Sequence, residues 1–223
     1  MRHSDTATVV FSNPSRTVRV YAVRIDFRIL PVALSLCRKI TKITNNNFNL
    51  KIIMNYNPEM KLSENFQLKE FVASQTAERL KIDNRPDWEV VINLRNLCQE
   101  VLQPLRNYAA EPIHINSGYR CEALNEAVHG VGNSQHLYGE AADIHLPSLA
   151  TGRRWYEWLV NHTDFDQLLF EYRRGGSRWL HLSCRRNKHE NRHMAFPNYP
   201  VAPRRGNGST GVRGANKEGA HAV

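Results

Sequence analysis

Two separated segments place the strongest constraint on how this chain folds. Residues 134–143 follow the pattern S-x-H-x-x-G-x-A-x-D, and residues 179–183, far downstream, read W-L-H-L-S. Together they offer two imidazoles, His136 and His181, and one carboxylate, Asp143. Three such ligands and one open position are what a catalytic zinc site needs. A fold that uses them must bring both segments to one place.

Strand periodicity predicts this convergence. In an extended strand over 141–146, Asp143 and His145 point to one face, and the intervening apolar residues point to the other. In a strand over 179–183, His181 likewise points away from its apolar neighbours. If the two strands are neighbours, Asp143 and His181 look out over one cleft that is backed by an apolar core.

The remaining pattern predicts an α+β domain. Apolar residues at spacings of three and four predict an amphipathic helix over about 86–106. Further elements are a strand at 112–115, helices at 122–128 and 151–161, and a hairpin of 165–172 with 179–183. Helices packed on a small antiparallel sheet give the α+β class.

The basic residues are concentrated at the two ends of the chain. Residues 1–53 hold 9 Lys and Arg against 2 Asp and Glu, and residues 185–223 hold 8 against 2, whereas the middle holds 13 against 17. The net charge of +9 therefore does not indicate a folded part that binds nucleic acid. Binding through the basic ends stays a weaker alternative, which would collapse with added salt.

The change in composition also predicts the domain boundaries. We expect a disordered or mistranslated N-terminal extension over residues 1–58, with Met54 as the true start, and one domain over 59–185. We expect a basic disordered tail over 186–223.

Neither the cysteines nor the apolar runs indicate a disulfide framework or a membrane span. The 4 cysteines form no C-x-x-C pair. No apolar run approaches the ~20 residues that span a bilayer, and the run at 29–37 lacks the cleavage site of a secretory signal. We expect a monomer without a membrane segment, cytoplasmic until it is released or exported to the cell wall.

The motif at 134–143 resembles that of the zinc D-Ala-D-Ala carboxypeptidases and their phage endolysin relatives, whose fold is shared by Hedgehog signalling domains. The resemblance covers about residues 61–184 and includes L-S-E-N-F at 62–66 and N-S-G-Y-R-C at 116–121. It is closest to the carboxypeptidase-like subgroup common in phages and prophages.

The resemblance implies roles for individual residues. His136, Asp143 and His181 would bind Zn²⁺. Arg120 would stabilise the scissile carbonyl or hold a substrate carboxylate, since its fixed charged fork suits a developing oxyanion. Ser134 would hydrogen-bond the substrate, although a loop cap is an equally good interpretation.

The general base is where the chain departs from its relatives. The vancomycin-resistance dipeptidases, which share this fold, carry an acidic residue three positions before the last zinc histidine, and Arg178 stands at that place. Glu171, on the other arm of the predicted hairpin, is the nearest candidate, because a hairpin folds its arms together. A solvated carboxylate at a strand end is the competing interpretation, and Asp166 and His145 are fallbacks.

These residues favour a zinc-dependent peptidase that hydrolyses peptidoglycan stem peptides, either as a D-Ala-D-Ala carboxypeptidase or as an endolysin-type endopeptidase. The alternative from another class is a noncatalytic, zinc-stabilised module that binds cell wall or protein.

Overall fold

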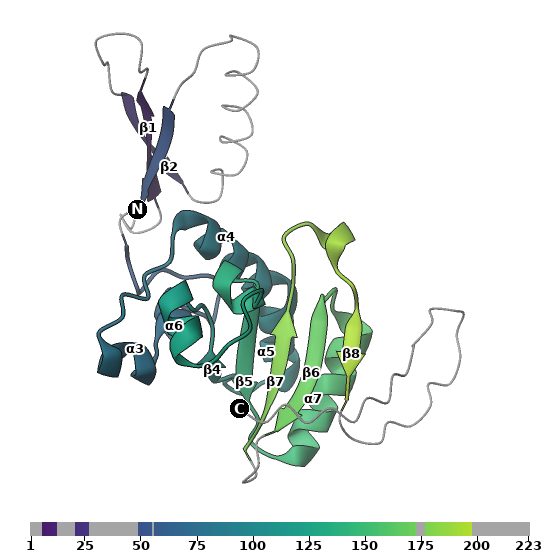
Figure 1. The fold of residues 1–223 in the computed structure, drawn as a ribbon. Helices are drawn as coiled ribbons and strands as arrows, with labels where there is room; N and C mark the ends of the chain where they lie inside the picture. The colour runs from purple at the N-terminus through teal and green to yellow at the C-terminus, as the bar shows by residue number, and fades with distance from the viewer. Residues whose placement is uncertain (1–5, 13–20, 27–48, 55, 173–176, 198–223) are drawn as a thin grey trace.

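A computed structural model describes residues 6–12, 21–26, 49–54, 56–172 and 177–197. The main sheet has five strands in the order β4-β5-β7-β6-β8. Their bounds are β4 (Ile115–Ser117), β5 (Ala141–His145), β6 (Gln167–Tyr172), β7 (Arg178–Ser183) and β8 (Met194–Phe196). All neighbours are antiparallel except β6 and β8, which are parallel, so the sheet is mixed. With the helices of Figure 1, this is the predicted α+β class.

One long helical segment and one further helix pack on the apolar face of the sheet and supply a large part of the core (Figure 1). The segment runs through α4 (Trp88–Leu97), the π-helical turn η1 (Cys98–Leu102) and α5 (Gln103–Ala109), close to the predicted 86–106. It starts at Asp87, whose carboxylate accepts a hydrogen bond from the Val90 amide. α7 (Leu149–His162) starts at Ser148 in the same way and buries Trp155 completely.

Shorter helices cover the other end of the sheet. They are α2 (Leu68–Val72), α3 (Gln75–Leu80), α6 (Glu122–Ala127) and the 3₁₀ turn η2 (Gln135–Tyr138). A second 3₁₀ turn, η3 (Lys188–Glu190), lies in the connection between β7 and β8. In Figure 1, α3 and α6 lie beyond β4, at the end of the sheet opposite β8. The apolar residues of β5, β6 and β7 point to the core, and their alternate residues point to the opposite face.

The chain continues in regular structure past the predicted boundary at residue 185. β8 lies within the region 186–223 that the sequence predicts to be a disordered tail, and it pairs with β6. The backbone amide of Met194 donates to the Asp166 carbonyl, and Lys188 forms an ion pair with Glu100 at 2.6 Å. Three strand residues in a polar stretch are too few to show a period, which is why the pattern predicts a tail.

A separate three-stranded antiparallel sheet precedes residue 59. β1 (Thr6–Ser12) lies between β2 (Tyr21–Asp26) and β3 (Asn49–Met54). The sequence predicts disorder over 1–58, whereas the structure has these strands, whose sequences are rich in residues that favour strands. Residues 1–5, 13–20, 27–48 and 55 of the predicted extension lie outside the described residues, and a start at Met54 stays a prediction.

Candidate metal and catalytic site

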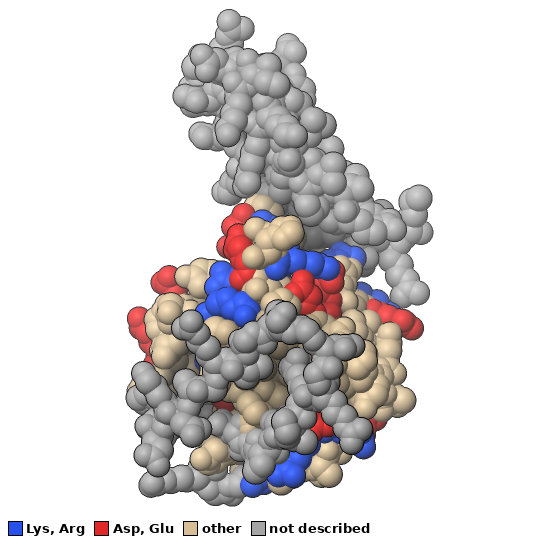
Figure 2. Space-filling view, turned by 90° about the vertical axis from the view of Figure 1, so that its right-hand side faces the viewer, with Lys and Arg blue, Asp and Glu red and all other residues tan. Residues whose placement is uncertain are grey.

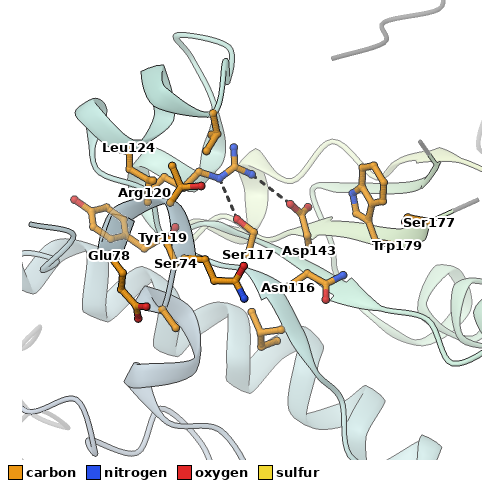
Figure 3. A pocket seen from close by; sticks show the side chains of 15 residues that line it. Ser74, Glu78, Asn116, Ser117, Tyr119, Arg120, Leu124, Asp143, Ser177 and Trp179 are labelled. Atoms are coloured by element: carbon orange, nitrogen blue, oxygen red, sulfur yellow. Dashed lines mark hydrogen bonds and ion pairs between the residues drawn. The ribbon is translucent and has the colours of Figure 1, made fainter. Parts of the chain in front are cut away.

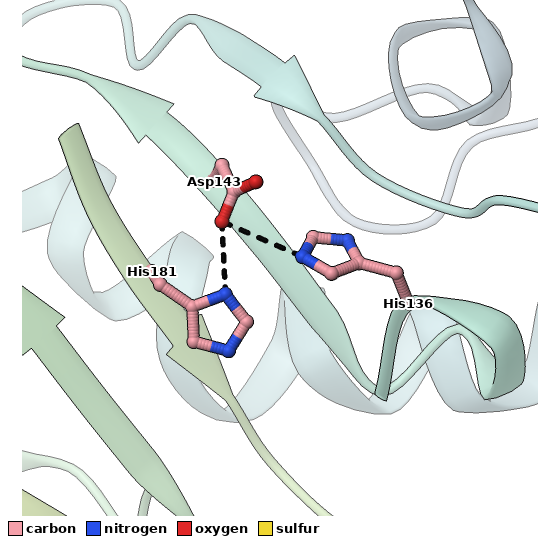
Figure 4. Close-up of side chains that lie close together, drawn as sticks. All are labelled: His136, Asp143 and His181. Carbon is pink, nitrogen blue, oxygen red and sulfur yellow. Dashed lines mark hydrogen bonds and ion pairs between the residues drawn. The ribbon is translucent and has the colours of Figure 1, made fainter. Parts of the chain in front are cut away.

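The structure brings His136, Asp143 and His181 together on the face of the sheet opposite the core (Figure 4). Asp143 on β5 lies directly opposite His181 on β7 in the strand register, as the strand periodicity predicts. His136 approaches from η2, which immediately precedes β5. One potential ligand atom from each residue lies within 4.8 Å of the others.

A backbone carbonyl fixes the orientation of His136. Its Nδ1 lies 2.6 Å from the Gly118 carbonyl oxygen, which can only accept, so Nδ1 carries the hydrogen and donates it. The other nitrogen, Nε2, faces Asp143 Oδ1 at 3.4 Å and is the one that a metal can bind once it carries no proton. Burial lowers the pKa of His136 despite the nearby Asp143 carboxylate, which favours the neutral imidazole that metals bind.

Asp143 uses its two oxygens differently. Oδ1 faces both histidines, with His181 Nδ1 at 2.8 Å, and Oδ2 accepts a hydrogen bond from the Arg120 guanidinium at 3.3 Å. Burial alone would raise the pKa of Asp143, but His136 and His181 hold it well below its usual range. The carboxylate is therefore charged.

The three side chains fit a zinc ion. Two atoms bound to one tetrahedral zinc at about 2.0–2.2 Å lie roughly 3.4 Å apart, and His136 Nε2 and Asp143 Oδ1 already have that separation. Histidines that bind metal almost always donate their second ring N–H to a carbonyl or carboxylate, as His136 does to Gly118. The set of two nitrogens and one oxygen is also one that zinc accepts.

Two glycines allow the backbone to bring these residues together. Gly139 ends η2 in the left-handed region at φ 69°, and a Cβ there would lie 2.7 Å from the Val90 carbonyl oxygen. At Gly118 a Cβ would lie 2.6 Å from the Phe71 carbonyl oxygen. Both positions therefore require glycine, the first for the turn into β5 and the second for the close approach of α2.

Arg120 lies beside the cluster and is held by its own turn. Its Nε donates to Ser117 Oγ at 3.0 Å, and its backbone N–H donates to the His136 carbonyl at 3.1 Å. Burial lowers the pKa of Arg120, while Asp143 opposes that shift. Within the described part of the chain these two side-chain bonds use two of the five guanidinium N–H groups, which leaves three for a ligand.

Asn84 fixes the peptide groups on both sides of Arg120, a role that the sequence analysis missed. Its amide nitrogen donates to the carbonyls of Val72 and Tyr119, and its oxygen accepts from the Cys121 amide at 2.8 Å. Asn84 lies just before the helix predicted over about 86–106, and the helix starts at Asp87. Side-chain bonds to residues 35 and 37 positions away leave no periodic signal in the sequence.

Glu171 shares the face of the metal cluster. In the β6–β7 register it lies opposite Trp179, and Leu169 lies opposite His181, so Glu171 and His181 are diagonal neighbours. Such neighbours lie about 7–8 Å apart. Burial raises the pKa of Glu171, with His181 opposing the shift, and a side-chain hydrogen bond from Trp179 also lowers it.

The other predicted residues lie in different surroundings. Ser134 is buried at the start of η2 and is not among the residues that line the cavity described below. Asp166 is fully buried and bound to Arg192 at 2.5 Å, so it is committed to an ion pair. His145 is exposed at the end of β5. The substrate-binding role of Ser134 stays a prediction, and Glu171 is the better placed of the three candidate bases.

A cavity of about 730 Å³ opens next to the cluster (Figure 3). Asp143 and Trp179 line it on one side of Arg120, and residues of α3 and α6 line it on the other. Its size falls within the roughly 300–1,000 Å³ typical of ligand-binding pockets. The wall mixes hydrogen-bonding and apolar side chains, which suits a peptide better than a purely apolar ligand.

On the face shown in Figure 2, Lys and Arg side chains lie next to Asp and Glu side chains, so the described part of that face presents no continuous basic stripe. Among the described residues, no helix combines the length and the apolar character that crossing a membrane requires.

Comparison with known proteins gives one informative match. The family model described as Peptidase M15 matches residues 64–183, which is more than half of the chain. The match contains all three residues of the cluster as well as Arg120 and Glu171. The comparison with curated proteins finds no match.

Proposed function

This chain belongs to the Peptidase M15 family, a family of zinc metallopeptidases, and we propose that it hydrolyses amide bonds in the stem peptides of peptidoglycan. The observation that carries the proposal is the convergence of His136, Asp143 and His181 beside a cavity that also contains Arg120. We assign His136, Asp143 and His181 as the zinc ligands. We also propose that the chain belongs to the carboxypeptidase-like subgroup of the family.

Each side chain has a task that its surroundings support. A zinc ion held by these ligands would supply Lewis acidity at the scissile carbonyl and a water molecule that ionises near neutral pH. Arg120, which has three N–H groups left, would donate to the oxygen on which negative charge develops. Because Asn84 fixes the peptide groups on both sides of Arg120, the guanidinium needs little reorganisation.

Glu171 would act as the general base and then as the general acid. It would accept a proton from the attacking water and pass it to the nitrogen of the leaving amine, so that water and amide become a carboxylic acid and an amine. Burial raises the pKa of Glu171 toward the neutral range in which a base is most effective. Asp166 is less suited, because hydrogen bonds from Arg192 lower its pKa to about 2 against the effect of burial.

The test is a Glu171→Gln variant of the full chain, loaded with zinc. We expect hydrolysis of a stem pentapeptide to fall by about 10²–10⁴-fold, while the bound zinc per chain stays unchanged. Glu157→Gln is the matched control, because Glu157 lies exposed on α7, on the core side of the sheet. Full activity of Glu171→Gln would refute the assignment of the base.

The alternative of a noncatalytic module makes the opposite prediction for the unmodified protein. Such a module would bind zinc through the same residues and leave stem peptides intact at every concentration of enzyme. Digestion of purified peptidoglycan, followed by mass spectrometry of the products, separates the two. New amine and carboxylate ends support the peptidase, and their absence in zinc-loaded protein supports the module.

A further inference from the structure

Trp179 lies on the same face of the sheet as the metal cluster. In the β5–β7 register it is opposite His145, two residues along each strand from the pair formed by Asp143 and His181. In Figure 3 its indole lies on the side of Asp143 away from Arg120, and both Trp179 and Asp143 line the cavity. The ring of Trp179 therefore forms part of the cavity wall next to the proposed zinc ligands.

Trp179 also contacts Glu171, the proposed general base. In the antiparallel β6–β7 pair the two residues lie directly opposite each other, which places their Cβ atoms about 4.5–5.5 Å apart. The side chains of Trp179 and Glu171 form a hydrogen bond. Because an indole has one N–H and no acceptor, Trp179 is the donor and the Glu171 carboxylate accepts.

A carboxylate at this place needs a fixed partner to work as a base. Glu171 is the last residue but one of β6, and a glutamate side chain has several rotatable bonds, so without a partner it would sample several rotamers. The indole is rigid and comes from the strand that also carries His181. One hydrogen bond from it fixes the direction of the carboxylate and leaves lone pairs that can accept a proton.

We propose that Trp179 is a positioning residue, whose indole N–H holds the Glu171 carboxylate in the orientation that takes a proton from the attacking water. The inference rests on the proposed function and adds to it a residue that acts through the base. Trp179 itself neither gains nor loses a proton in the reaction. Its ring has the separate task of forming the cavity wall.

The test is a Trp179→Phe variant of the full chain, loaded with zinc. Phenylalanine keeps an aromatic ring at the cavity wall and removes the N–H. We expect the kcat for a stem pentapeptide to fall by about 10–100-fold, the cost of one hydrogen bond to a charged group. KM and the bound zinc per chain should stay unchanged, because the lost contact is one to the base and not to the substrate or the metal.

A double variant separates action through Glu171 from an independent effect. If Trp179 acts through the carboxylate, Trp179→Phe should cause no further loss of kcat in the Glu171→Gln background, whereas the effects of independent residues multiply. Trp158→Phe is the matched control, because Trp158 lies on α7, on the core side of the sheet, and stacks with Tyr108 and His162. It loses the same N–H away from the cavity, and its kcat and KM should stay unchanged.

The results that would overturn the inference differ in what they leave standing. If Trp179→Phe keeps full kcat while Glu171→Gln is inactive, the positioning role is refuted and the proposed base stands. A change in KM alone, or an equal further loss in the Glu171→Gln background, would also refute it, since Trp179 would then act on the substrate or independently of the base. If the unmodified zinc-loaded protein leaves stem peptides intact, the proposed function fails together with the inference.

Discussion

Two buried carboxylates in the same sheet differ in the groups that surround them. Asp143 on β5 has a side chain that is 14% exposed, and Asp166, just before β6, is 0% exposed. Asp143 faces two imidazoles and one guanidinium. Asp166 accepts hydrogen bonds from the side chain and the backbone of Arg192 and from Gln135.

Asp143 can exchange its contacts with the imidazoles for contacts with a metal, whereas Asp166 keeps its guanidinium partner. Guanidinium groups stay charged at any ordinary pH, so Asp166 keeps the same partners under all working conditions. Imidazoles can give up a proton and bind a metal through the same nitrogen, so the partners of Asp143 can become fellow ligands. Burial of a carboxylate therefore does not identify a functional site, whereas the kind of partner does.

The two sites are linked through one residue. Gln135 donates from its amide nitrogen to Asp166 Oδ2 at 2.8 Å, and it is the neighbour of His136 in η2. The ion pair of Asp166 and Arg192 thereby ties the segment that leads to β8 to the turn that carries a proposed zinc ligand. These contacts help to hold the segment before β8 in place against the rest of the domain.

The largest expected effect is the loss of metal binding on Asp143→Asn. Removing a residue that only orients a ligand typically costs about 10–100-fold in metal affinity, and removal of a charged ligand should cost more. We expect hydrolysis to fall to background with it. Zinc titration against a chelating indicator measures the affinity, and Asp166→Asn is the control, with an affinity that stays within about tenfold of the unmodified protein.

Equal losses of affinity in both variants would contradict the comparison. They would mean that Asp166 supports the metal site as strongly as Asp143 does, through Gln135 and η2. A loss confined to Asp166→Asn would refute the assignment of Asp143 as a ligand.

The second effect is on the free energy of unfolding, and here Asp166→Asn should lose more than Asp143→Asn. Asp166→Asn removes the negative charge that pairs with Arg192 and leaves that cation without its partner. Breaking a buried pair costs about 3–5 kcal/mol, but Arg192 is 42% exposed, so we expect a loss of about 2 kcal/mol. Urea unfolding of the metal-free protein measures it, and Asp143→Asn should lose less, because its imidazole partners can stay neutral. A larger loss for Asp143→Asn would contradict this.

Much of the fold and of the cluster could be predicted because both follow from short periods. The alternation of residues in 141–146 and 179–183 placed Asp143 and His181 on one face, and the β5–β7 register confirms that placement. The spacing of apolar residues likewise predicted the long helix, although not its π-helical turn. The catalytic and metal-binding roles of these residues remain predictions.

The parts that could not be predicted depend on contacts between distant side chains. Asn84 sits in a segment whose composition also suits a helix start, and its bonds to the turn of Arg120 have no local signature. Arg192 lies in a stretch whose polar character predicts a tail, and its pairing with buried Asp166 adds to the β6–β8 pairing that holds β8 in place. Such long-range polar contacts carry no period that a single sequence reveals.

The smallest expected effect is a pH dependence that belongs to Asp166. Burial would raise its pKa, but the hydrogen bonds from Arg192 and Gln135 lower it to about 2, against an ordinary value of about 3.9 in the unfolded chain. A lowered folded-state pKa gives a stabilisation that is complete above the unfolded value and is lost as the pH falls toward the folded value. The stability advantage of the unmodified protein over Asp166→Asn should therefore be constant above about pH 5 and shrink between about pH 4 and 2.

Urea unfolding of both proteins at a series of pH values, with a chelator present, measures this difference. Because other carboxylates titrate in the same range, only the difference between the two proteins reports on Asp166, and the chelator removes the contribution of the metal ligands. An advantage that stays constant down to pH 2 would mean that Arg192 and Gln135 do not lower the pKa of Asp166. Asp166 would then resemble an ordinary surface carboxylate, and the contrast with Asp143 would rest on burial alone.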